Sequence, residues 1–328
     1  MKIGFCYDFK DHYGFDPNNM DYTDFSTIST VNDIVSAFDM LDFDVELIGP
    51  IFELIKKIES GQMDCDLIFN ITEGINSRNR EGLLPALLEI YKIPFSGSDA
   101  YPLSLTLNKT HTKLIAEHLK IPTPKFAVFS SIDDTISAEQ LEYPLVIKPN
   151  LEGGSMGVEK VNDVAELREK VALLLEKYHS EVLCEEYISG TEITVPIIGN
   201  GVDARVLGVA AAKYTDGRNI ELFTSGLKYF GDIEYTTDFD CSKEALEKLE
   251  EYSLELFKFI GLNDYSRIDF RLSEDEIPYF LEINPLPALD KEDAFDICGI
   301  SKGLKYHETI NLIITEAIKR NHLESLLL

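Results

Sequence analysis

Four polar residues in segment 266–285 have the types and spacing of a metal and oxyanion site: Arg267, Asp269, Glu282 and Asn284. Side chains alternate along a strand, so a hairpin that pairs Arg267 with Glu282 places all four on one face. Two carboxylates and an amide oxygen suit Mg²⁺, and an adjacent guanidinium can stabilise an oxyanion. The segment therefore predicts metal-dependent chemistry, although a solvated face with a cross-strand Arg–Glu pair would show the same pattern.

The opposite face of the same hairpin is expected to be apolar. A turn at Glu274 and Asp275 would pair Leu272 with Ile277. The core face would then carry Ile268, Phe270, Leu272, Tyr279, Leu281 and Ile283. A slip of one residue would bury the charges, so the pattern predicts the register.

A glycine-rich stretch, residues 147–161, reads IKPNLEGGSMGVEKV. Glycine permits positive φ, so the stretch fits a hairpin loop between two strands. It fits equally a loop whose backbone N–H groups contact phosphate. It has neither the Walker Gly-Lys-Ser/Thr nor the dinucleotide G-x-G-x-x-G pattern, so both interpretations stay open on these residues alone.

The charge balance excludes several kinds of partner. The 328 residues include 30 Lys and Arg against 58 Asp and Glu, a formal net charge of −28. Such a chain repels nucleic acid and anionic membranes, so we expect neither as a partner. A polyphosphate would have to be bound locally, by a few cations, backbone N–H groups and metal. The five scattered cysteines and the absence of a signal peptide predict a reduced, cytoplasmic protein.

The order of expected elements divides the chain into three parts. Residues 1–108 alternate between strand and helix patterns, which predicts an N-terminal parallel α/β domain. Residues 109–190 predict a central α+β lobe that contains the glycine-rich stretch. Residues 191–328 predict a C-terminal lobe with a largely antiparallel sheet and the polar hairpin.

Six motifs, in order along the chain, resemble the ATP-grasp superfamily and most closely its D-alanine–D-alanine ligase branch: NKTHTK, VIKPNLEGGSMGV, LCEEYISGTEITV, LKYF, SRIDFRL and FLEINPLP. The resemblance implies an α/β (α+β) ATP-grasp fold of three subdomains, in which two α+β lobes clasp ATP. It implies a carboxylate–amine ligase that works through an acyl phosphate. The implied cofactors are ATP and two Mg²⁺ ions, with Mn²⁺ as a substitute. The implied partners are small-molecule carboxylates and amines, and a homodimer is compatible with the resemblance.

The resemblance also implies roles for the matching residues. Contacts to the phosphates would come from Lys109, Lys148, Gly153, Gly154, Ser155, Gly157 and Lys228. Adenine and ribose would be bound by Glu185, Glu186, Ile188 and Glu192. The metal ligands would be Asp269, Glu282 and Asn284. The catalytic set would be Arg267, Lys228, Ser155 and Gly154, and the substrate contacts Glu73, Tyr229 and Asp293.

The chain departs from the ligase pattern at the substrate positions. The family's His-Gly is Glu73-Gly74, a substrate-orienting serine is Gly154, and the serine that receives a substrate carboxylate falls near Asp293. Two acidic clusters accompany these changes: Asp8, Asp11, Asp16, Asp21 and Asp24, and then Asp290, Glu292, Asp293 and Asp296. We therefore expect substrates other than D-alanine and an acceptor that is cationic beyond its reacting amine. The alternatives are a D-alanine–D-alanine ligase proper, an ATP-grasp kinase and a non-catalytic nucleotide-binding protein.

Overall fold

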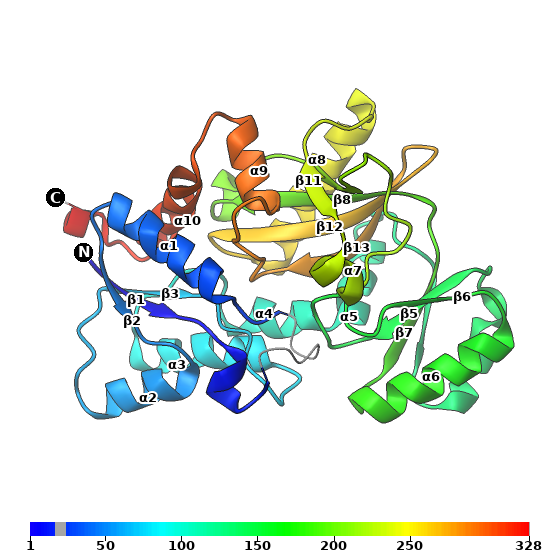
Figure 1. The fold of residues 1–328 in the computed structure, drawn as a ribbon, viewed down its shortest axis with the longest axis horizontal. Helices are drawn as coiled ribbons and strands as arrows, with labels where there is room; N and C mark the ends of the chain where they lie inside the picture. The colour runs from blue at the N-terminus through cyan, green and yellow to red at the C-terminus, as the bar shows by residue number, and fades with distance from the viewer. Residues whose placement is uncertain (17–23, 328) are drawn as a thin grey trace.

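In the computed structural model, residues 1–16 and 24–327 are described, apart from the side chains of residues 136, 139 and 228–230. Within these ranges the chain forms three β-sheets surrounded by helices (Figure 1). The mixed α and β class predicted from the sequence is confirmed. No helix in the described ranges has both the length and the apolar character needed to cross a membrane.

The N-terminal sheet is parallel, with strand order β2-β1-β3. Its strands are β1 (Lys2–Cys6), β2 (Asp44–Leu47) and β3 (Leu67–Asn70). The surrounding helices are η1 (Lys10–Tyr13), α1 (Ile28–Met40), α2 (Ile51–Glu59), η2 (Arg80–Gly82), α3 (Leu83–Tyr91) and α4 (Ala100–Leu107). Phe5, Phe38 and Phe69 form a buried aromatic group with ring centroids 5.1–6.3 Å apart. The parallel arrangement predicted for this part of the chain is confirmed.

The far end of the chain completes the core of this N-terminal sheet. Helix α10 (Tyr306–Arg320) lies beside α1 (Figure 1). Its residues Ile313 and Ala317 are fully buried in one cluster with Ile3 and Phe5. The first strand and the last long helix therefore share one hydrophobic core.

The central sheet has the order β4-β7-β5-β6 and is antiparallel. Its strands are β4 (Phe126–Phe129), β5 (Leu145–Pro149), β6 (Glu159–Val161) and β7 (Val182–Glu186), with helices η3 (Ile132–Gln140) and α6 (Val164–Tyr178). Strand β5 pairs with β6, Leu145 opposite Val161. The glycine-rich stretch therefore joins two antiparallel strands, as the hairpin interpretation predicts.

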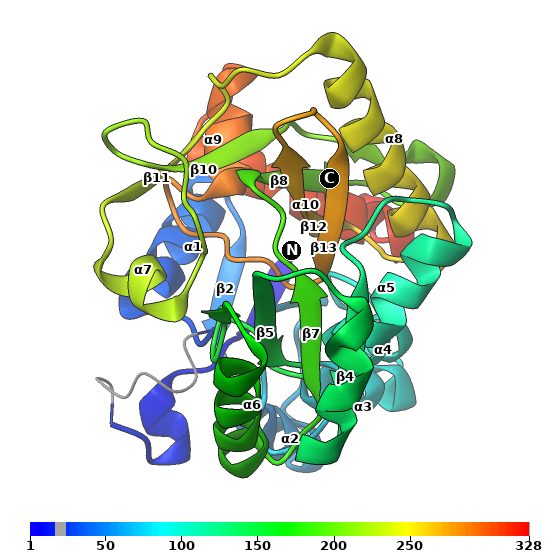
Figure 2. The same ribbon diagram turned by 90° about the vertical axis from the view of Figure 1, so that its right-hand side faces the viewer.

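The third sheet is antiparallel, with order β11-β10-β8-β12-β13 and β9 beside β8. Its strands are β8 (Gly190–Ile198), β9 (Arg205–Val206), β10 (Ala210–Tyr214), β11 (Ile233–Thr236), β12 (Tyr265–Ser273) and β13 (Pro278–Asn284). The associated helices are α5 (Lys109–His118), η4 (Gly201–Asp203), α7 (Ser225–Phe230), α8 (Lys243–Ile260), α9 (Ala294–Ser301) and η5 (Glu324–Leu327). In Figure 2 the central sheet lies below this sheet, with α6 and α8 on opposite outer sides of the molecule. Residues of α5 and α8 share its core, among them Ala116 and Phe257.

The register predicted for the β12–β13 hairpin is wrong by one to two residues. Arg267 lies opposite Asn284 and Asp269 opposite Glu282, and a β-bulge then shifts the pairing so that Phe270 lies opposite Phe280. The bulge inserts one unpaired residue and reverses the alternation on β13. Phe280 is therefore in the core, whereas Tyr279 and Leu281 are only partly buried and Ile277 is exposed. The four polar residues lie on the side of the bulge away from the turn, so their side chains still share one face of the sheet: Arg267, Asp269, Glu282 and Asn284.

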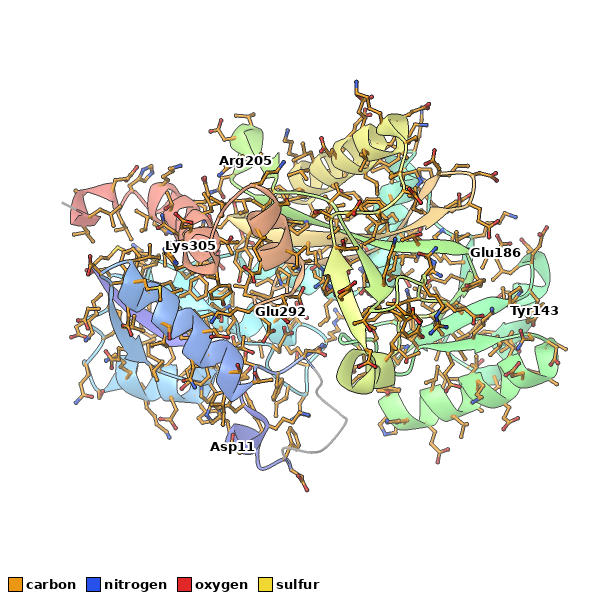
Figure 3. The ribbon with its side chains drawn as sticks, turned by 45° about the horizontal axis from the view of Figure 1, so that its top comes forward. Asp11, Tyr143, Glu186, Arg205, Glu292 and Lys305 are labelled. Carbon is orange, nitrogen blue, oxygen red and sulfur yellow. The ribbon has the colours of Figure 1, made fainter. Side chains whose placement is uncertain are left out.

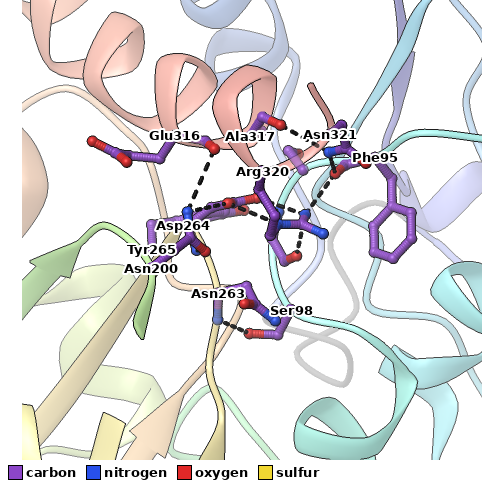
Figure 4. A network of polar contacts seen from close by, with 12 residues as sticks. Phe95, Ser98, Asn200, Asn263, Asp264, Tyr265, Glu316, Ala317, Arg320 and Asn321 are labelled. Atoms are coloured by element: carbon purple, nitrogen blue, oxygen red, sulfur yellow. Dashed lines mark hydrogen bonds and ion pairs between the residues drawn. The ribbon is translucent and has the colours of Figure 1, made fainter. Parts of the chain in front are cut away.

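A buried ion pair fastens the N-terminal part of the chain to the third sheet (Figure 4). The carboxylate of Asp264, which is fully buried, accepts hydrogen bonds from Arg320 Nε at 3.0 Å and from Arg320 Nη2 at 2.8 Å. It also accepts from the backbone N–H of Gly97 at 2.8 Å and from Asn200 Nδ2 at 3.0 Å. Arg320 donates further to the carbonyl of Phe95 at 2.7 Å.

We expect Arg320→Lys to destabilise the protein by about 1–3 kcal/mol, because a lysine cannot satisfy all the acceptors that the guanidinium contacts. The measurement is the free energy of unfolding in urea. Lys305→Arg, an exchange at the start of the same helix, is the control and should change it little. Equal stability of the Arg320→Lys protein and the original would contradict the structural role assigned to this residue.

Candidate active site

Two adjoining cavities lie where the three parts of the chain meet. The larger has a volume of about 370 Å³ and the smaller about 80 Å³. Both are lined by Lys109, Ser155, Glu192, Phe223, Asp269 and Glu282. The shared lining indicates one continuous site, with a narrow arm toward the central sheet and a wider arm toward the N-terminal sheet.

The polar residues of the β12–β13 hairpin form the wall between the two arms. Arg267 donates to both oxygens of Asp269, from Nε at 3.0 Å and from Nη2 at 2.9 Å. Asn284 Nδ2 and Thr194 Oγ1 also donate to this carboxylate, each at 2.7 Å. Burial works against the charge of Arg267, yet Asp269 keeps the pKa of the guanidinium above its ordinary value. The hairpin thus holds a fixed cation and a carboxylate in one place.

Glu282 lines the same two cavities but makes fewer polar contacts than Asp269. Its nearest described cation is Lys109 Nζ, 3.4 Å from Oε2. Burial alone would raise the pKa of Glu282, but Lys109 and Lys148 outweigh it and lower the pKa below its ordinary value. Two carboxylates on paired strands, with the Asn284 amide beside them, are a donor set that could hold a divalent cation.

Lysines from two different elements reach this site. Lys109 is the first residue of α5, and its ammonium also donates to the carbonyl of Glu152 in the glycine-rich loop. Lys148, on β5, lies 2.7 Å from Glu185 Oε1 and lines the smaller cavity. Burial lowers the pKa of Lys148, but Glu185 and Glu282 reverse this effect and raise it. Both lysines are positively charged groups inside an acidic protein.

The smaller cavity is lined by the residues that the resemblance assigns to adenine and ribose. Glu185, Glu186, Ile188 and Glu192 all line it. Glu192 Oε2 lies 2.9 Å from Arg271 Nη1. Burial raises the pKa of Glu192, and Arg271 acts in the opposite direction. The structure thus brings these four predicted residues together.

Sequence reasoning missed Arg271. This residue is 5% exposed and also donates to the backbone carbonyls of Ile188, Ile220 and Glu221 at 2.8–3.0 Å. It therefore fixes two segments that line the smaller cavity. The alternation that identified Arg267 and Asp269 also points to residue 271 on the same face, and this signal was available in the sequence.

The glycine-rich loop borders both cavities. Gly154 and Gly157 have φ values of +55° and +66°, and a Cβ on Gly157 would lie 2.9 Å from Pro149 Cδ, so glycine is required there. Gly153 adjoins Asp24, because a Cβ built on it would lie 2.5 Å from Asp24 Oδ2. The carbonyl of Ser155 accepts the N–H of Ser225, 3.3 Å away, at the start of α7. Lys228 and Tyr229 belong to α7, but their side chains lie outside the described part of the structure.

The larger cavity has a strongly acidic wall. Asp24, Glu73, Glu81, Asp290 and Asp293 line it. Glu81 is 7% exposed, and burial raises its pKa to about 7 against the opposing effect of Arg80. Burial, with Glu81 and Asp24 nearby, also raises the pKa of Glu73. Sequence reasoning identified Glu73 and Asp293 but missed Glu81.

Only part of each predicted acidic cluster reaches the cavity. Asp8 is fully buried, where it accepts hydrogen bonds from Gly74 N and Tyr13 Oη at 2.8 Å each. Asp11 and Asp16 are exposed and Asp21 lies outside the described residues, so Asp24 alone of the first cluster is described in the cavity wall. Figure 3 labels Asp11 on η1, at the edge of the N-terminal part. Asp11, in η1, and Asp16, which follows that helix, are not among the residues that line the cavity.

The second acidic cluster divides in the same way. Asp290 and Asp293 line the cavity, whereas Glu292, labelled in Figure 3, is exposed and Asp296 accepts the N–H of Glu292 at 3.0 Å. Asp293 is the N-cap of α9 and its Oδ1 lies 3.9 Å from Arg267 Nη1. Asp293 therefore borders the same space as the guanidinium.

Comparison with known proteins gives a consistent result. Residues 115–315 match the family model described as D-ala D-ala ligase C-terminus. The chain is 32% identical over 235 residues to a D-alanine–D-alanine ligase of Aquifex aeolicus (strain VF5), covering 72% of this chain and 77% of that protein. It is 31% identical over 256 residues to the uncharacterized protein y4sG of Sinorhizobium fredii (strain NBRC 101917 / NGR234), covering 77% and 75%.

A solved structure extends the comparison to the whole fold. The D-alanine–D-alanine ligase of Bacillus anthracis complexed with ATP superposes with a TM-score of 0.76 at 23% identity, covering 98% of each chain. The likeness therefore includes the N-terminal sheet as well as the region matched by the family model, and the predicted ATP-grasp fold is confirmed.

Proposed function

Because the chain belongs to the D-alanine–D-alanine ligase family of ATP-grasp enzymes, which form C–N bonds, we propose that it joins a small-molecule carboxylate to an amine through an acyl phosphate. One observation carries the proposal: Arg267, Asp269, Glu282 and Asn284 face a cavity that Lys109 and the glycine-rich loop also line. A protein that only bound nucleotide would not need this guanidinium and these carboxylates beside the phosphate-binding lysines.

ATP is proposed to span the two cavities. Adenine and ribose occupy the smaller arm, beside the backbone of Glu186 and Ile188 and the carboxylate of Glu192. The phosphates lie at the shared wall, where Lys109 and Lys148 supply positive charge and the loop at 153–157 supplies backbone N–H groups. Lys228 is proposed to reach the γ-phosphate. The cavity lining and the order of the family motifs support this placement.

Mg²⁺ fits the donors at the wall between the arms. Asp269, Glu282 and the amide oxygen of Asn284 would hold it, as oxygen ligands on two neighbouring strands. When bound, the metal neutralises charge on the transferring phosphate.

The residues then have distinct parts in two steps. In the first, a carboxylate oxygen of the substrate attacks the γ-phosphorus, the bond to the β–γ bridging oxygen breaks, and ADP leaves. In the second, the amine nitrogen attacks the acyl carbon, phosphate leaves, and the nitrogen loses its proton. Arg267 donates to the oxyanion that forms on the acyl carbon. The loop at 153–157 excludes the water that would hydrolyse the acyl phosphate.

The wide arm is proposed to select a cationic amine. Among the residues that line it, the charged ones not assigned to ATP, metal or the oxyanion are all acidic: Asp24, Glu73, Glu81, Asp290 and Asp293; Arg80, behind this wall, lies 3.5 Å from Asp24. A free carboxylate on the acceptor would meet Asp293 at a cost of about 1–4 kcal/mol at 4 Å. A diamine or an amidated amino acid avoids this repulsion, and the second cation of a basic amino acid offsets it.

We expect turnover with lysine-like amino acids or diamines to exceed turnover with D-alanine by about fivefold or more, and high salt to reduce the difference. Asp293→Ser should improve D-alanine as an acceptor, because serine keeps the helix cap while removing the charge. Glu292→Gln, at an exposed neighbour outside the cavity wall, is the control. Best activity with D-alanine, unchanged by Asp293→Ser, would refute the cationic acceptor.

The ligase proposal itself is tested by product analysis. Purified protein with ATP and Mg²⁺ is incubated with matrices of carboxylates and amines, ADP release is recorded, and products are identified by mass. We expect an amide whose mass equals the two substrates minus water. ADP release with a phosphorylated product and no amide would indicate a kinase instead.

A further inference from the structure

Behind the proposed phosphate site lies a lysine that sequence reasoning did not single out. Lys113, on α5, is fully buried, and the linings described for the two cavities do not include it. Its ammonium lies 2.7 Å from Glu185 Oε2 and donates to Thr123 Oγ1 at 2.8 Å. The Thr123 hydroxyl in turn donates to the carbonyl of Phe280 at 2.8 Å. Lys113 is thus held in one place by the central sheet on one side and by β13 on the other.

Glu185 lies between two ammonium groups. Its Oε2 is near Lys113 and its Oε1 is 2.7 Å from Lys148 Nζ. Burial opposes ionisation, yet the two lysines lower the pKa of Glu185 to about 2. The carboxylate is therefore charged, and the three side chains together carry a net charge of +1 when both lysines are protonated.

This charge balance matters for an anionic ligand. Lys148 with Glu185 alone would be a neutral ion pair, which attracts phosphate weakly. With Lys113 also bound to Glu185, one positive charge remains; Lys148 and Glu185 both line the smaller cavity, whereas Lys113 lies outside its lining. We propose that Lys113 is a positioning residue for ATP: it neutralises Glu185 from behind and so leaves the charge of Lys148 available to the phosphate chain. The inference rests on the proposed ATP site.

We expect Lys113→Met to weaken binding of ATP about tenfold, which corresponds to about 1.4 kcal/mol. Binding is measured by calorimetry with Mg²⁺, and inorganic tripolyphosphate serves as a second ligand because it lacks adenine. Both ligands should lose affinity by a similar factor. The control is Lys170→Met, which breaks the 2.5 Å ion pair with Glu159 on the central lobe and should change neither affinity.

A double variant separates a charge effect from a structural one. Lys113→Met with Glu185→Gln removes one charge of each sign, so Lys148 regains its unpaired positive charge. Tripolyphosphate affinity should recover by at least about threefold relative to Lys113→Met alone. If the double variant binds no better than the single one, or if Lys113→Met binds like the original protein, the inference is wrong.

The unmutated protein offers a readout that needs no substitution. Burial lowers the pKa of Lys113 to about 8, against the raising effect of Glu185. The groups that face it are Glu185 from β7, Lys148 from β5 and, further away, Glu282 from β13. Above pH 8 the ammonium loses its proton, the trio becomes neutral, and ATP affinity should fall. The double variant should lack this decline, and a decline of equal size in it would contradict the role of Lys113.

Failure of this inference is distinguishable from failure of the proposed function. If the original protein binds neither ATP nor tripolyphosphate, the ATP site is wrong and the inference falls with it. If the original protein binds both and Lys113→Met binds them equally well, the site stands and only the role of Lys113 is rejected.

Discussion

Glu282→Gln is expected to reduce ATP-dependent turnover about a thousandfold, equivalent to about 4 kcal/mol of transition-state stabilisation. Glutamine has nearly the same shape but lacks the anionic oxygen that a divalent cation requires. Glu282 pairs with Asp269 across the hairpin and faces Lys109 at 3.4 Å, so its loss leaves Asp269 as the remaining carboxylate on the described polar face of the hairpin. Turnover is measured by ADP release with saturating Mg²⁺.

The control for this variant is Asp275→Asn, which removes an exposed carboxylate from the turn of the same hairpin. It should retain full turnover, and both variants should unfold at the same urea concentration as the original. Chelation of divalent cations should also abolish turnover, and Mg²⁺ or Mn²⁺ should restore it. Full activity in excess chelator would overturn the metal assignment.

Arg267→Ala is expected to cost about 2.7–4 kcal/mol in turnover, the usual loss for one oxyanion donor, while ATP affinity stays near that of the original protein. The guanidinium borders the larger cavity, where the acyl group would lie, and contacts Asp269 rather than the adenine-lining segments. Calorimetry with ATP and turnover assays on the same preparation separate the two effects.

Arg271 is the matched comparison, four residues along the same strand. It contacts Glu192 and the backbone around the smaller cavity, so Arg271→Ala should weaken ATP binding as well as turnover. If Arg267→Ala loses ATP affinity in step with turnover, as Arg271→Ala should, then Arg267 is a nucleotide-binding or structural residue and not an oxyanion donor.

The polar face of the hairpin was predictable because strand alternation is a local property. Predicting that Asp269 and Glu282 share one face requires only the alternation of side chains along each strand, and that alternation is visible in the sequence. The register was not predictable, since the β-bulge near Leu281 leaves no signature in the residue types. A bulge allows Phe280 to enter the core where strict alternation would place Leu281.

Lys113 and Glu81 show a second reason why parts of the site could not be predicted from the sequence. A lysine in a helix and a glutamate near a glycine are most often solvated, so residue type alone favours the surface for both. Their burial depends on contacts distant in sequence: Glu185 is 72 positions from Lys113, and the cavity beside Glu81 is walled by residues 24 and 290. Helix and strand patterns do not record such contacts, whereas the family motifs located Lys109, Lys148 and Glu185 because they occur in a known order.

The core shared by β1 and α10 has a consequence for synthesis in the cell. Ile3 and Phe5 are synthesised roughly 300 residues before Ile313 and Ala317, which cover the same core. Until then the nascent chain exposes an apolar surface, which favours aggregation and chaperone binding. A product truncated before Tyr306, where α10 begins, would leave that surface uncovered, so quality-control proteases should remove it much faster than a chain that carries α10.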